Sequence, residues 1–146
     1  PVRPTPPTIG GPPPVTDLAR GKPTAQSSQT QGYGSANSVD GNQDTYWESA
    51  NNAFPQWVQV DLGSPAAVRR LELALPSSWG PRTQTITVQG STDGGSFTTL
   101  VAATGYTFAP GTTITLPGRD ARYLRLVFTA NTGWPAGQLS NLRAFA

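Results

Sequence analysis

The chain has 146 residues, only 12% of them charged, and a formal net charge of +2. It contains no Cys and no His, which excludes a thiol nucleophile, a disulfide, a zinc finger and a Ser-His-Asp triad. Its longest basic run is Arg69-Arg70, so there is no dense phosphate-binding stripe and no nucleic-acid partner is expected. The composition favours a binding or structural domain over an enzyme.

The chain opens with a proline-rich segment, in which seven of the first 14 residues are Pro. Such sequence prefers the extended polyproline II conformation, a semi-rigid spacer of about 3.1 Å per residue. Residues 1–16 are therefore interpreted as a linker and residues 17–146 as one folded module, within a fragment of a longer protein. A proline-rich recognition motif is the competing interpretation of the first segment.

Beyond the linker, short segments of alternating apolar and polar residues are separated by Gly, Pro, Asn and Asp. Residues 57–62 show the pattern clearly and end at a Gly-Ser-Pro turn. β-branched and aromatic enrichment with a period of two indicates strands. The expected strands are residues 57–62, 68–75, 83–88, 97–102, 112–116, 123–128 and 139–145. Seven or eight strands without a helical stripe predict an all-β protein, an antiparallel β-sandwich or jelly roll.

Three segments do not fit this strand pattern. Residues 26–52 form a long polar stretch and residues 130–137 a second connector, and connectors of this kind commonly carry binding sites. Residues 90–95 are rich in glycine, but they lack the Lys and the following helix of a phosphate-binding loop. We expect residues 90–95 to form a hairpin turn.

Six short motifs in one order resemble the discoidin-like (coagulation factor V/VIII type C) superfamily. They are ANSVDGN at 36–42, DTYWES at 44–49, PQWVQVDLG at 55–63, VQGSTDG at 88–94, ARYLRL at 121–126 and QLSNL at 138–142. Within that superfamily the chain is similar to carbohydrate-binding modules of secreted bacterial glycoside hydrolases. The resemblance runs from about residue 18 to residue 145. It implies a jelly-roll β-sandwich of the galactose-binding-domain type.

The resemblance also implies a structural calcium ion in the loop that contains Asp40. Carried over residue by residue, the ligands are the Ser38 carbonyl, Asp40, Asn42, Thr45, the Gln138 carbonyl and Asn141. Calcium prefers such oxygen ligands. Many relatives have Glu where this chain has Asn141, and the missing charge should weaken binding. The alternative is an ordinary Asp-Gly turn without metal.

The four Trp residues fall into two groups. Trp57 lies within an expected strand and Trp47 follows the Asp40 loop, so both are predicted to belong to the core. Trp79 and Trp134 lie in turn sequences, where an aromatic ring either caps the core or contacts a ligand. Both interpretations stay open for Trp79 and Trp134.

A sugar site is expected where loop aromatics lie beside polar side chains, because sugars present C–H faces and hydroxyl rims. Trp79 and Arg82 supply both kinds of contact within three residues. Relatives bind sugar with loops at one end of the sandwich, which adds further candidates. The full candidate set is Trp79, Arg82, Glu48, Asn51, Asn52, Tyr33 and Trp134.

Three charged residues in strands are assigned no role in binding. Asp61 ends an expected strand and is interpreted as structural, as it is in relatives. Arg122 and Arg125 are three residues apart, so regular alternation predicts opposite faces and no shared anion site.

The function these observations favour is a non-catalytic carbohydrate-binding module. It would tether a secreted, bacterial polysaccharide-degrading enzyme to its substrate, and the absence of His makes a glucan the first expected ligand. We expect a monomer linked covalently to a catalytic domain. An adhesion domain for a protein or an anionic membrane surface is the alternative, although the low charge makes a membrane partner unfavourable. A catalytic β-sandwich is the third interpretation.

Overall fold

The computed structural model describes residues 16–146, so the linker prediction lies outside the described residues apart from Thr16. The first contacts with the sheets are made by Asp17 and Leu18. The Leu18 amide donates to the Ala144 carbonyl at 2.8 Å, and the Ala144 amide donates to Asp17 Oδ1 at 3.0 Å. The chain is thus held to the last strand from residue 17 onward.

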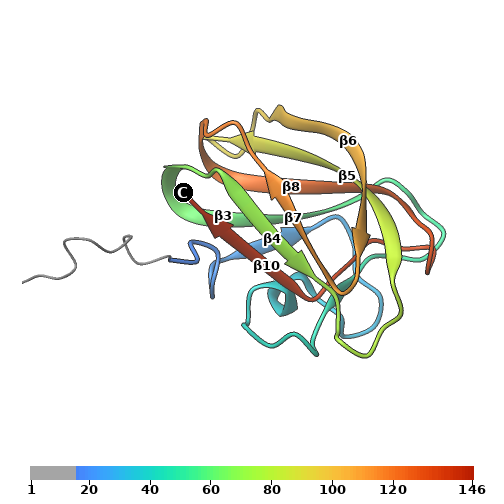
Figure 1. The fold of residues 1–146 in the computed structure, drawn as a ribbon. Coiled ribbons are helices and arrows are strands. Elements are labelled where there is room, and N and C mark those ends of the chain that lie inside the picture. Colours follow the sequence, from blue (N-terminus) through green and yellow to red (C-terminus); the bar gives the residue numbers. More distant parts are fainter. Residues whose placement is uncertain (1–15) are drawn as a thin grey trace, which may run out of the picture.

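Two antiparallel sheets face each other across one core (Figure 1). The larger has the order β1 (Thr24–Gln26), β3 (Gln56–Ala67), β8 (Asp120–Asn131), β5 (Arg82–Ser91) and β6 (Thr98–Phe108). The smaller has the order β10 (Asn141–Phe145), β4 (Arg70–Ala74) and β7 (Gly111–Thr115). The short strands β2 (Trp47–Glu48) and β9 (Gln138–Leu139) pair separately. The antiparallel jelly-roll β-sandwich predicted from the sequence is confirmed.

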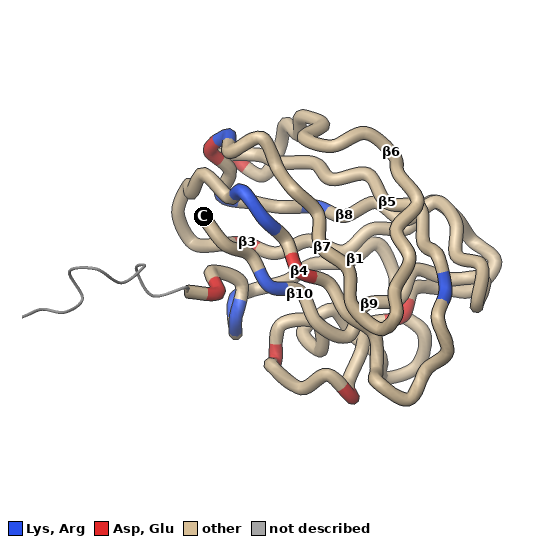
Figure 2. The backbone as a smooth tube through the Cα atoms, viewed as in Figure 1, with Lys and Arg blue, Asp and Glu red and all other residues tan. Residues whose placement is uncertain are grey.

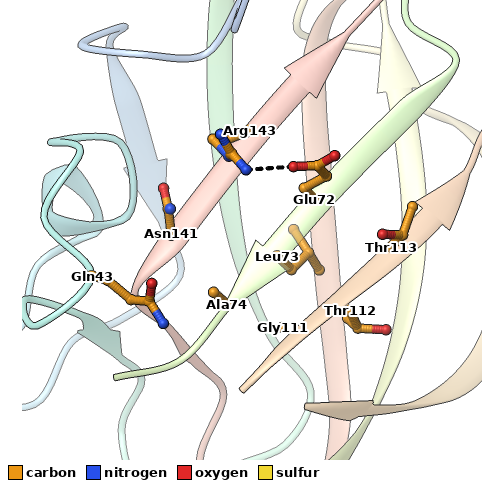
Figure 3. A pocket seen from close by; sticks show the side chains of 9 residues that line it. All are labelled: Gln43, Glu72, Leu73, Ala74, Gly111, Thr112, Thr113, Asn141 and Arg143. Carbon is orange, nitrogen blue, oxygen red and sulfur yellow. Dashed lines mark hydrogen bonds and ion pairs between the residues drawn. The ribbon is translucent and has the colours of Figure 1, made fainter. Parts of the chain in front are cut away.

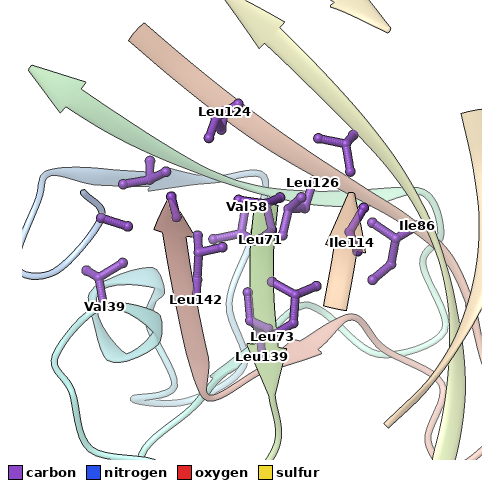
Figure 4. Packing of buried hydrophobic residues seen from close by; sticks show 14 of the residues in the cluster. Val39, Val58, Leu71, Leu73, Ile86, Ile114, Leu124, Leu126, Leu139 and Leu142 are labelled. Atoms are coloured by element: carbon purple, nitrogen blue, oxygen red, sulfur yellow. The ribbon is translucent and has the colours of Figure 1, made fainter. Parts of the chain in front are cut away.

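Alternation along each strand explains the two faces. In β3, Val58 and Val60 are buried while the residues between them are half-buried, and in β4 Leu71 and Leu73 point the same way into the core. Figure 4 shows Val58, Leu71 and Leu73 meeting between the sheets. Because side chains alternate across a strand, the intervening positions are left on the outer faces.

Six of the seven expected strand segments are confirmed as single strands. The seventh, residues 139–145, is divided at Ser140 between β9 and β10, which pair in different sheets, and the structure adds short strands that sequence patterning missed. Strands β1 and β2 lie in or beside the polar stretch 26–52, which also holds the 3₁₀ turn η2 (Ser35–Ser38). Strands of two or three residues are too short to show a period, and their pairing partners fix them. In the part of the chain that the structure describes, no helix has the length and hydrophobicity needed to cross a membrane.

Trp47 is fully buried, which confirms its assignment to the core. Its ring lies 5.5 Å from that of Phe128, and its Nε1 donates to the Ser28 carbonyl at 3.0 Å. Trp47 therefore satisfies its polar atom while filling the space beneath the loops.

The assignment of Trp57 to the core is wrong. The buried side chains of β3 are at even positions such as Val58, so Trp57 lies on the outer face of the larger sheet and is only half-buried. There the Arg125 guanidinium stacks on its ring, with Cζ 4.0 Å from the centroid, and lies equally close to the ring of Phe97. A large aromatic residue inside an alternating strand is compatible with the inner or the outer face. The contacts with the neighbouring strand determine which face it occupies.

The expected separation of Arg122 and Arg125 onto opposite faces is also wrong. Arg122 forms an ion pair with Asp61 at 2.8 Å, and Arg125 donates to Gln59 Oε1 at 2.8 Å. Both partners lie on the outer face of β3. The regular alternation fails because the pairing of β3 with β8 contains a bulge, which re-aims one side chain. Asp61 is engaged in this ion pair, in line with a structural role.

Candidate functional site

A cavity of about 300 Å³ lies where the β2–β9 ribbon meets the turn before β5 and the connector after β8. We call it the aromatic cavity. Its lining residues are Tyr46, Glu48, Trp79, Arg82, Trp134 and Gln138. Four of the seven sugar-site candidates, those at positions 48, 79, 82 and 134, are thus brought together from segments that are far apart in the sequence.

One wall of the aromatic cavity is a stack of rings. Tyr46 lies edge-on to Trp79 with 4.6 Å between centroids, and Tyr33 stacks behind Tyr46 at 4.5 Å. Trp79 is half-buried and packs against the core while it faces the cavity. The two interpretations of Trp79 are therefore compatible, because the same side chain packs against the core and lines the cavity.

Arg82 supplies the polar side of that wall. Its guanidinium lies over the Trp79 ring with Cζ 4.8 Å from the centroid, and Nη1 donates to Gln138 Oε1 at 3.0 Å. A planar guanidinium held in this way presents its remaining donors in a fixed direction.

Glu48 places a carboxylate in the aromatic cavity, and its side chain is largely buried. Gln138 Nε2 donates to Glu48 Oε1 at 2.8 Å and Asn51 Nδ2 donates to Oε2 at 3.2 Å. Among residues 16–146 no cation pairs with Glu48. Burial raises the pKa of the adjacent Tyr46, aided by the neighbouring Tyr33 hydroxyl and the Glu48 carboxylate, so the Tyr46 phenol stays neutral.

Trp134 also lines the aromatic cavity and is the one large hydrophobic side chain that is strongly exposed among the described residues, at 50%. Its Nε1 donates to Asn51 Oδ1 at 2.7 Å. This bond holds an exposed ring that would otherwise rotate freely. The other three candidates do not line the aromatic cavity. The Asn52 backbone amide donates to the Pro135 carbonyl, whereas Tyr33 and Asn51 contact residues that do line the cavity.

A buried pair of amides supports the site from below and was missed in the sequence. Gln84 Oε1 accepts from the Gln138 amide at 3.0 Å, and Gln84 Nε2 donates to the Gln138 carbonyl at 2.9 Å. Asn131 adds a bond to Gln138 Oε1 at 3.1 Å. Gln84 is fully buried because it occupies an inward position of β5, in line with Ile86 and Val88. A polar residue at a position where the alternation predicts an apolar one is the sequence signal that could have revealed this support. Tyr46 was also missed, and no separate sequence signal marks it.

The Asp40 loop, residues 40–45, gathers oxygen atoms around one hydroxyl. Thr45 Oγ1 lies 2.5 Å from Asp40 Oδ2, 3.0 Å from the Asn42 carbonyl and 3.5 Å from the Asn37 carbonyl. The Thr45 amide also donates to the Asn42 carbonyl at 3.3 Å, so two donors of Thr45 face three acceptor oxygens and lone pairs remain in excess. A hard cation such as calcium prefers such an arrangement.

The other predicted calcium ligands are not all in this cluster. Gln138 belongs to the aromatic cavity, and its carbonyl already accepts from Gln84. Asn141 lies at the start of β10 beside Gln43 of the Asp40 loop (Figure 3). The Ser38 hydroxyl donates to the Ser35 carbonyl. The predicted ligand at this position is the Ser38 carbonyl, which this bond does not involve. Of the predicted ligands, Asp40, Asn42 and Thr45 therefore lie together in one loop, whereas Gln138 lies in the aromatic cavity.

Comparison with known proteins agrees with this fold. The family model for F5/F8 type C domains described as "NedA-like, galactose-binding domain" matches residues 37–126. A chitosan-binding module 1 from a chitosanase/glucanase of Paenibacillus sp. IK-5 is 30% identical, with a TM-score of 0.73 over 90% of this chain and 99% of that one. No curated protein matches the chain.

Two more distant structures share the fold. The family 32 carbohydrate-binding module of NanJ from Clostridium perfringens, in complex with galactose, is 19% identical with a TM-score of 0.78 over 90% of this chain and 99% of that one. A second module produced by Clostridium perfringens, in complex with GlcNAc-α-1,4-galactose, is 17% identical with a TM-score of 0.73 over 94% of this chain and 98% of that one.

Proposed function

Because the chain belongs to the NedA-like, galactose-binding-domain family of F5/F8 type C domains, we propose that its aromatic cavity binds a polysaccharide. In this proposal the chain is a non-catalytic, secreted bacterial module. It holds a polysaccharide-degrading enzyme near its substrate by raising the effective concentration of one for the other.

The observation that carries the proposal is the pairing of Trp79 and Trp134 with polar groups around one small cavity. The faces of a sugar ring carry C–H groups that pack on aromatic rings, and its hydroxyls need donors and acceptors at the rim. Arg82 supplies donors and Glu48 supplies acceptors. A cavity of about 300 Å³ is at the small end of the usual range for ligand sites of about 300–1,000 Å³, which suits a short stretch of sugar.

The hydrogen bonds behind the cavity support binding as well. Gln138 links Arg82 to Glu48, because its Oε1 accepts from the first and its Nε2 donates to the second. Side chains fixed in this way lose little rotamer freedom when a ligand arrives, which lowers the cost of binding. We expect affinities between about micromolar and millimolar, since a sugar buries little area.

We propose a neutral glucan as the first ligand. Arg82 and Glu48 give the cavity lining a formal net charge of zero, although they form no ion pair with each other, so the lining as a whole does not require a charged sugar. Chitosan is the second candidate. The buried Glu48 carboxylate, which has no cationic partner in residues 16–146, would attract the ammonium group of an amino sugar, and the Paenibacillus relative is a chitosan-binding module.

The test is retention on a panel of soluble and insoluble polysaccharides that includes cellulose, β-1,3-glucan, chitin and chitosan. If the ligand is a glucan, the wild type should be retained on a glucan, and the Glu48→Gln variant should be retained on it almost as strongly. A chitosan ligand predicts retention on chitosan alone, lost in Glu48→Gln and weakened by salt. Lack of retention on every polysaccharide would contradict the proposed function, and release of reducing sugar would contradict a non-catalytic role.

The adhesion alternative has less support. Insertion into a membrane needs several exposed apolar side chains beside basic residues, and Trp134 is the one strongly exposed large hydrophobic side chain in residues 16–146. The basic residues are few and scattered over the described surface (Figure 2). A vesicle pull-down run beside the polysaccharide panel separates the two functions.

We also propose that the Asp40 loop holds a structural calcium ion, with Asp40, Asn42 and Thr45 among its ligands. The excess of acceptor oxygens around Thr45 Oγ1 supports this proposal. No three acidic, His or Cys side chains gather anywhere in residues 16–146, so the ion would depend on neutral oxygens and bind weakly.

A further inference from the structure

A second concave surface lies on the outer face of the smaller sheet. It is a groove of about 380 Å³ over β10, β4 and β7, and none of its lining residues lines the aromatic cavity (Figure 3). We call it the sheet groove. In β4, Leu71 and Leu73 point into the core, so Glu72 and Ala74 face outward and form part of the surface.

The pairing register explains why the sheet is hollow here. One row across the three strands consists of Asn141, Ala74 and Gly111, so the middle and one edge of the row carry almost no side chain. The next row, Arg143, Glu72 and Thr113, carries longer side chains. A row of small residues beside a row of large ones leaves a trough with a wall on one side.

The second wall comes from the Asp40 loop. Gln43 reaches over the sheet, and its Nε2 donates to the Leu75 carbonyl at 2.9 Å. Figure 3 shows Gln43 and Asn141 on one side of Ala74, with Thr112 and Thr113 on the other. The sheet groove is therefore bounded on two sides by amide and hydroxyl groups.

Most of these polar groups have spare hydrogen-bonding capacity. Within residues 16–146 the side chains of Asn141, Thr112 and Thr113 have no hydrogen-bond partner, and Gln43 uses only its amide nitrogen. An amide side chain both donates and accepts, and a hydroxyl does the same. Such a lining matches a ligand that is itself rich in hydroxyl groups.

The two charged side chains that line the groove are paired with each other, and Arg70 adds a second guanidinium beside Glu72 from outside the lining. Arg143 Nη2 lies 2.5 Å from Glu72 Oε1, and Arg70 Nε lies 3.1 Å from Glu72 Oε2. The Glu72 carboxylate is thus already paired with two guanidinium groups, and the groove lining contributes one formal charge of each sign. The lining itself has no net charge, which suits a neutral ligand, and the second guanidinium of Arg70 beside Glu72 disfavours a cationic one.

We propose that the sheet groove is a second saccharide-binding site, which takes a neutral stretch of polysaccharide chain. The class of ligand rests on the function proposed for the aromatic cavity, but the site itself is separate from it. Two sites on one module let a single polysaccharide surface be held twice, so the apparent affinity for a polymer exceeds that for a short oligosaccharide.

The groove can be filled without touching the aromatic cavity. Ala74→Tyr puts a ring into the trough, and an aromatic suits a strand position on an outer face. The matched control is Thr115→Tyr, because Thr115 is an exposed outer-face position of β7 that does not line the groove. Asn141 is left unchanged because it is also a candidate calcium ligand.

The experiment compares the wild type, Trp79→Ala, Ala74→Tyr, Thr115→Tyr and the double variant Trp79→Ala/Ala74→Tyr. Retention in affinity electrophoresis is measured on soluble β-glucans and chitosan. Backbone amide shifts are measured by NMR with cello-, laminari- and chito-oligosaccharides. We expect Ala74→Tyr to bind the polymer about tenfold more weakly than the wild type and Thr115→Tyr to bind normally. The double variant should lose the residual retention of Trp79→Ala, in which added oligosaccharide should still shift the amides of Gly111 and Thr113.

The two proposals fail differently. If shifts are confined to Glu48, Trp134 and Gln138 and Ala74→Tyr binds the polymer normally, the sheet groove is not a saccharide site and the function of the aromatic cavity stands. If no saccharide shifts any amide, both proposals fall. Should Ala74→Tyr fail to fold, the shifts at Gly111 and Thr113 in Trp79→Ala decide the matter alone.

Discussion

The Arg82 guanidinium lies over the Trp79 ring with 4.8 Å between Cζ and the ring centroid, and the two residues are three apart in the sequence. The spacing works because Trp79 lies in the turn after β4 and Arg82 begins β5, so the turn folds one side chain back onto the other. Gln138 fixes the guanidinium from the far side through its Oε1. The result is a ring whose orientation is set before any ligand arrives, which is what a stacking platform requires.

Trp79→Ala should strongly weaken retention on the polysaccharide that the wild type binds, leaving only the residual retention expected from the sheet groove. Loss of a stacked aromatic of this kind removes about 2 kcal/mol, which weakens an already weak affinity roughly thirtyfold. Because Trp79 is half-buried and packs on the core at its edge, we expect some loss of thermal stability but a folded domain. Affinity electrophoresis and a melting curve on the same sample check both expectations.

The matched control for Trp79→Ala is Trp57→Ala. Trp57 is also half-buried, but it lies on the outer face of the larger sheet beneath Arg125, away from the aromatic cavity. The variant should fold and bind the polysaccharide as the wild type does. If Trp57→Ala loses binding as completely as Trp79→Ala, the platform has been assigned to the wrong part of the molecule.

Chelation should lower the melting temperature by several degrees if the Asp40 loop holds calcium. An ion that binds only the folded state stabilises it by mass action, with about 2.7 kcal/mol at a hundredfold excess over Kd. Asp40→Ala should have the same melting temperature with and without calcium, close to that of the wild type in chelator. Asp44→Ala serves as the control, because its side chain is in the same loop but not among the oxygens around Thr45 Oγ1. Identical melting curves for the wild type in chelator and in excess calcium would leave only an Asp-Gly turn.

The general fold could be predicted from the sequence because the alternation of apolar and polar residues survives in every long strand. Val58 and Val60 are two positions apart, so they lie on the same face of β3, and that face is the buried one. The face on which Trp57 lies could not be predicted, since a half-buried Trp is compatible with either side of a strand. That choice depends on Arg125 of the neighbouring strand, which is 68 residues further along the chain.

The site shows the same division. Trp79 and Arg82 could be predicted as a pair because a turn brings close neighbours together. The resemblance places the Gln138 carbonyl among the calcium ligands, but the role of its side chain in the cavity could not be predicted, because its bond to Glu48 spans 90 positions and exists only once β2 and β9 pair. Local patterns specify local geometry, and a site assembled by long-range pairing appears only in the fold.

The Asp61–Arg122 ion pair should make stability depend on acid pH. The Arg122 guanidinium lowers the pKa of Asp61 below its ordinary value, which is near 3.9 in an unfolded chain. The unfolded state therefore binds the proton more readily, so the stabilisation is complete above about pH 5, well above the unfolded pKa, and is lost as the pH falls through the lower folded pKa. Asp61→Asn should melt below the wild type near neutral pH and approach it toward about pH 3. Arg122→Gln should remove the same part of the pH dependence, and a constant gap between wild type and Asp61→Asn at all pH values would contradict the assignment.

Gly137→Ala should destabilise the domain and weaken sugar binding together. A Cβ at position 137 would lie 3.0 Å from Cη2 of Trp47 and 3.1 Å from Cγ of Phe128, and both of these rings are fully buried. The rings cannot retreat without disturbing the core, and overpacking of this kind costs about 1–3 kcal/mol. Gly137 also exchanges hydrogen bonds with Ser49, because its amide donates to Ser49 Oγ at 2.8 Å and its carbonyl accepts from the Ser49 amide at 2.9 Å. A shift at this point moves the next residue, Gln138, which connects the polar groups of the aromatic cavity.

The control for this substitution is Gly32→Ala. Nothing lies within 4 Å of a Cβ at position 32, so the same added methyl group should leave the melting temperature unchanged or slightly raised. The measurements are melting curves and polysaccharide retention for both variants. If Gly137→Ala has the same melting temperature as Gly32→Ala and binds normally, the packing beside Trp47 and Phe128 can accommodate an added methyl group. The position of Gln138 would then not depend on close packing under the β2–β9 ribbon.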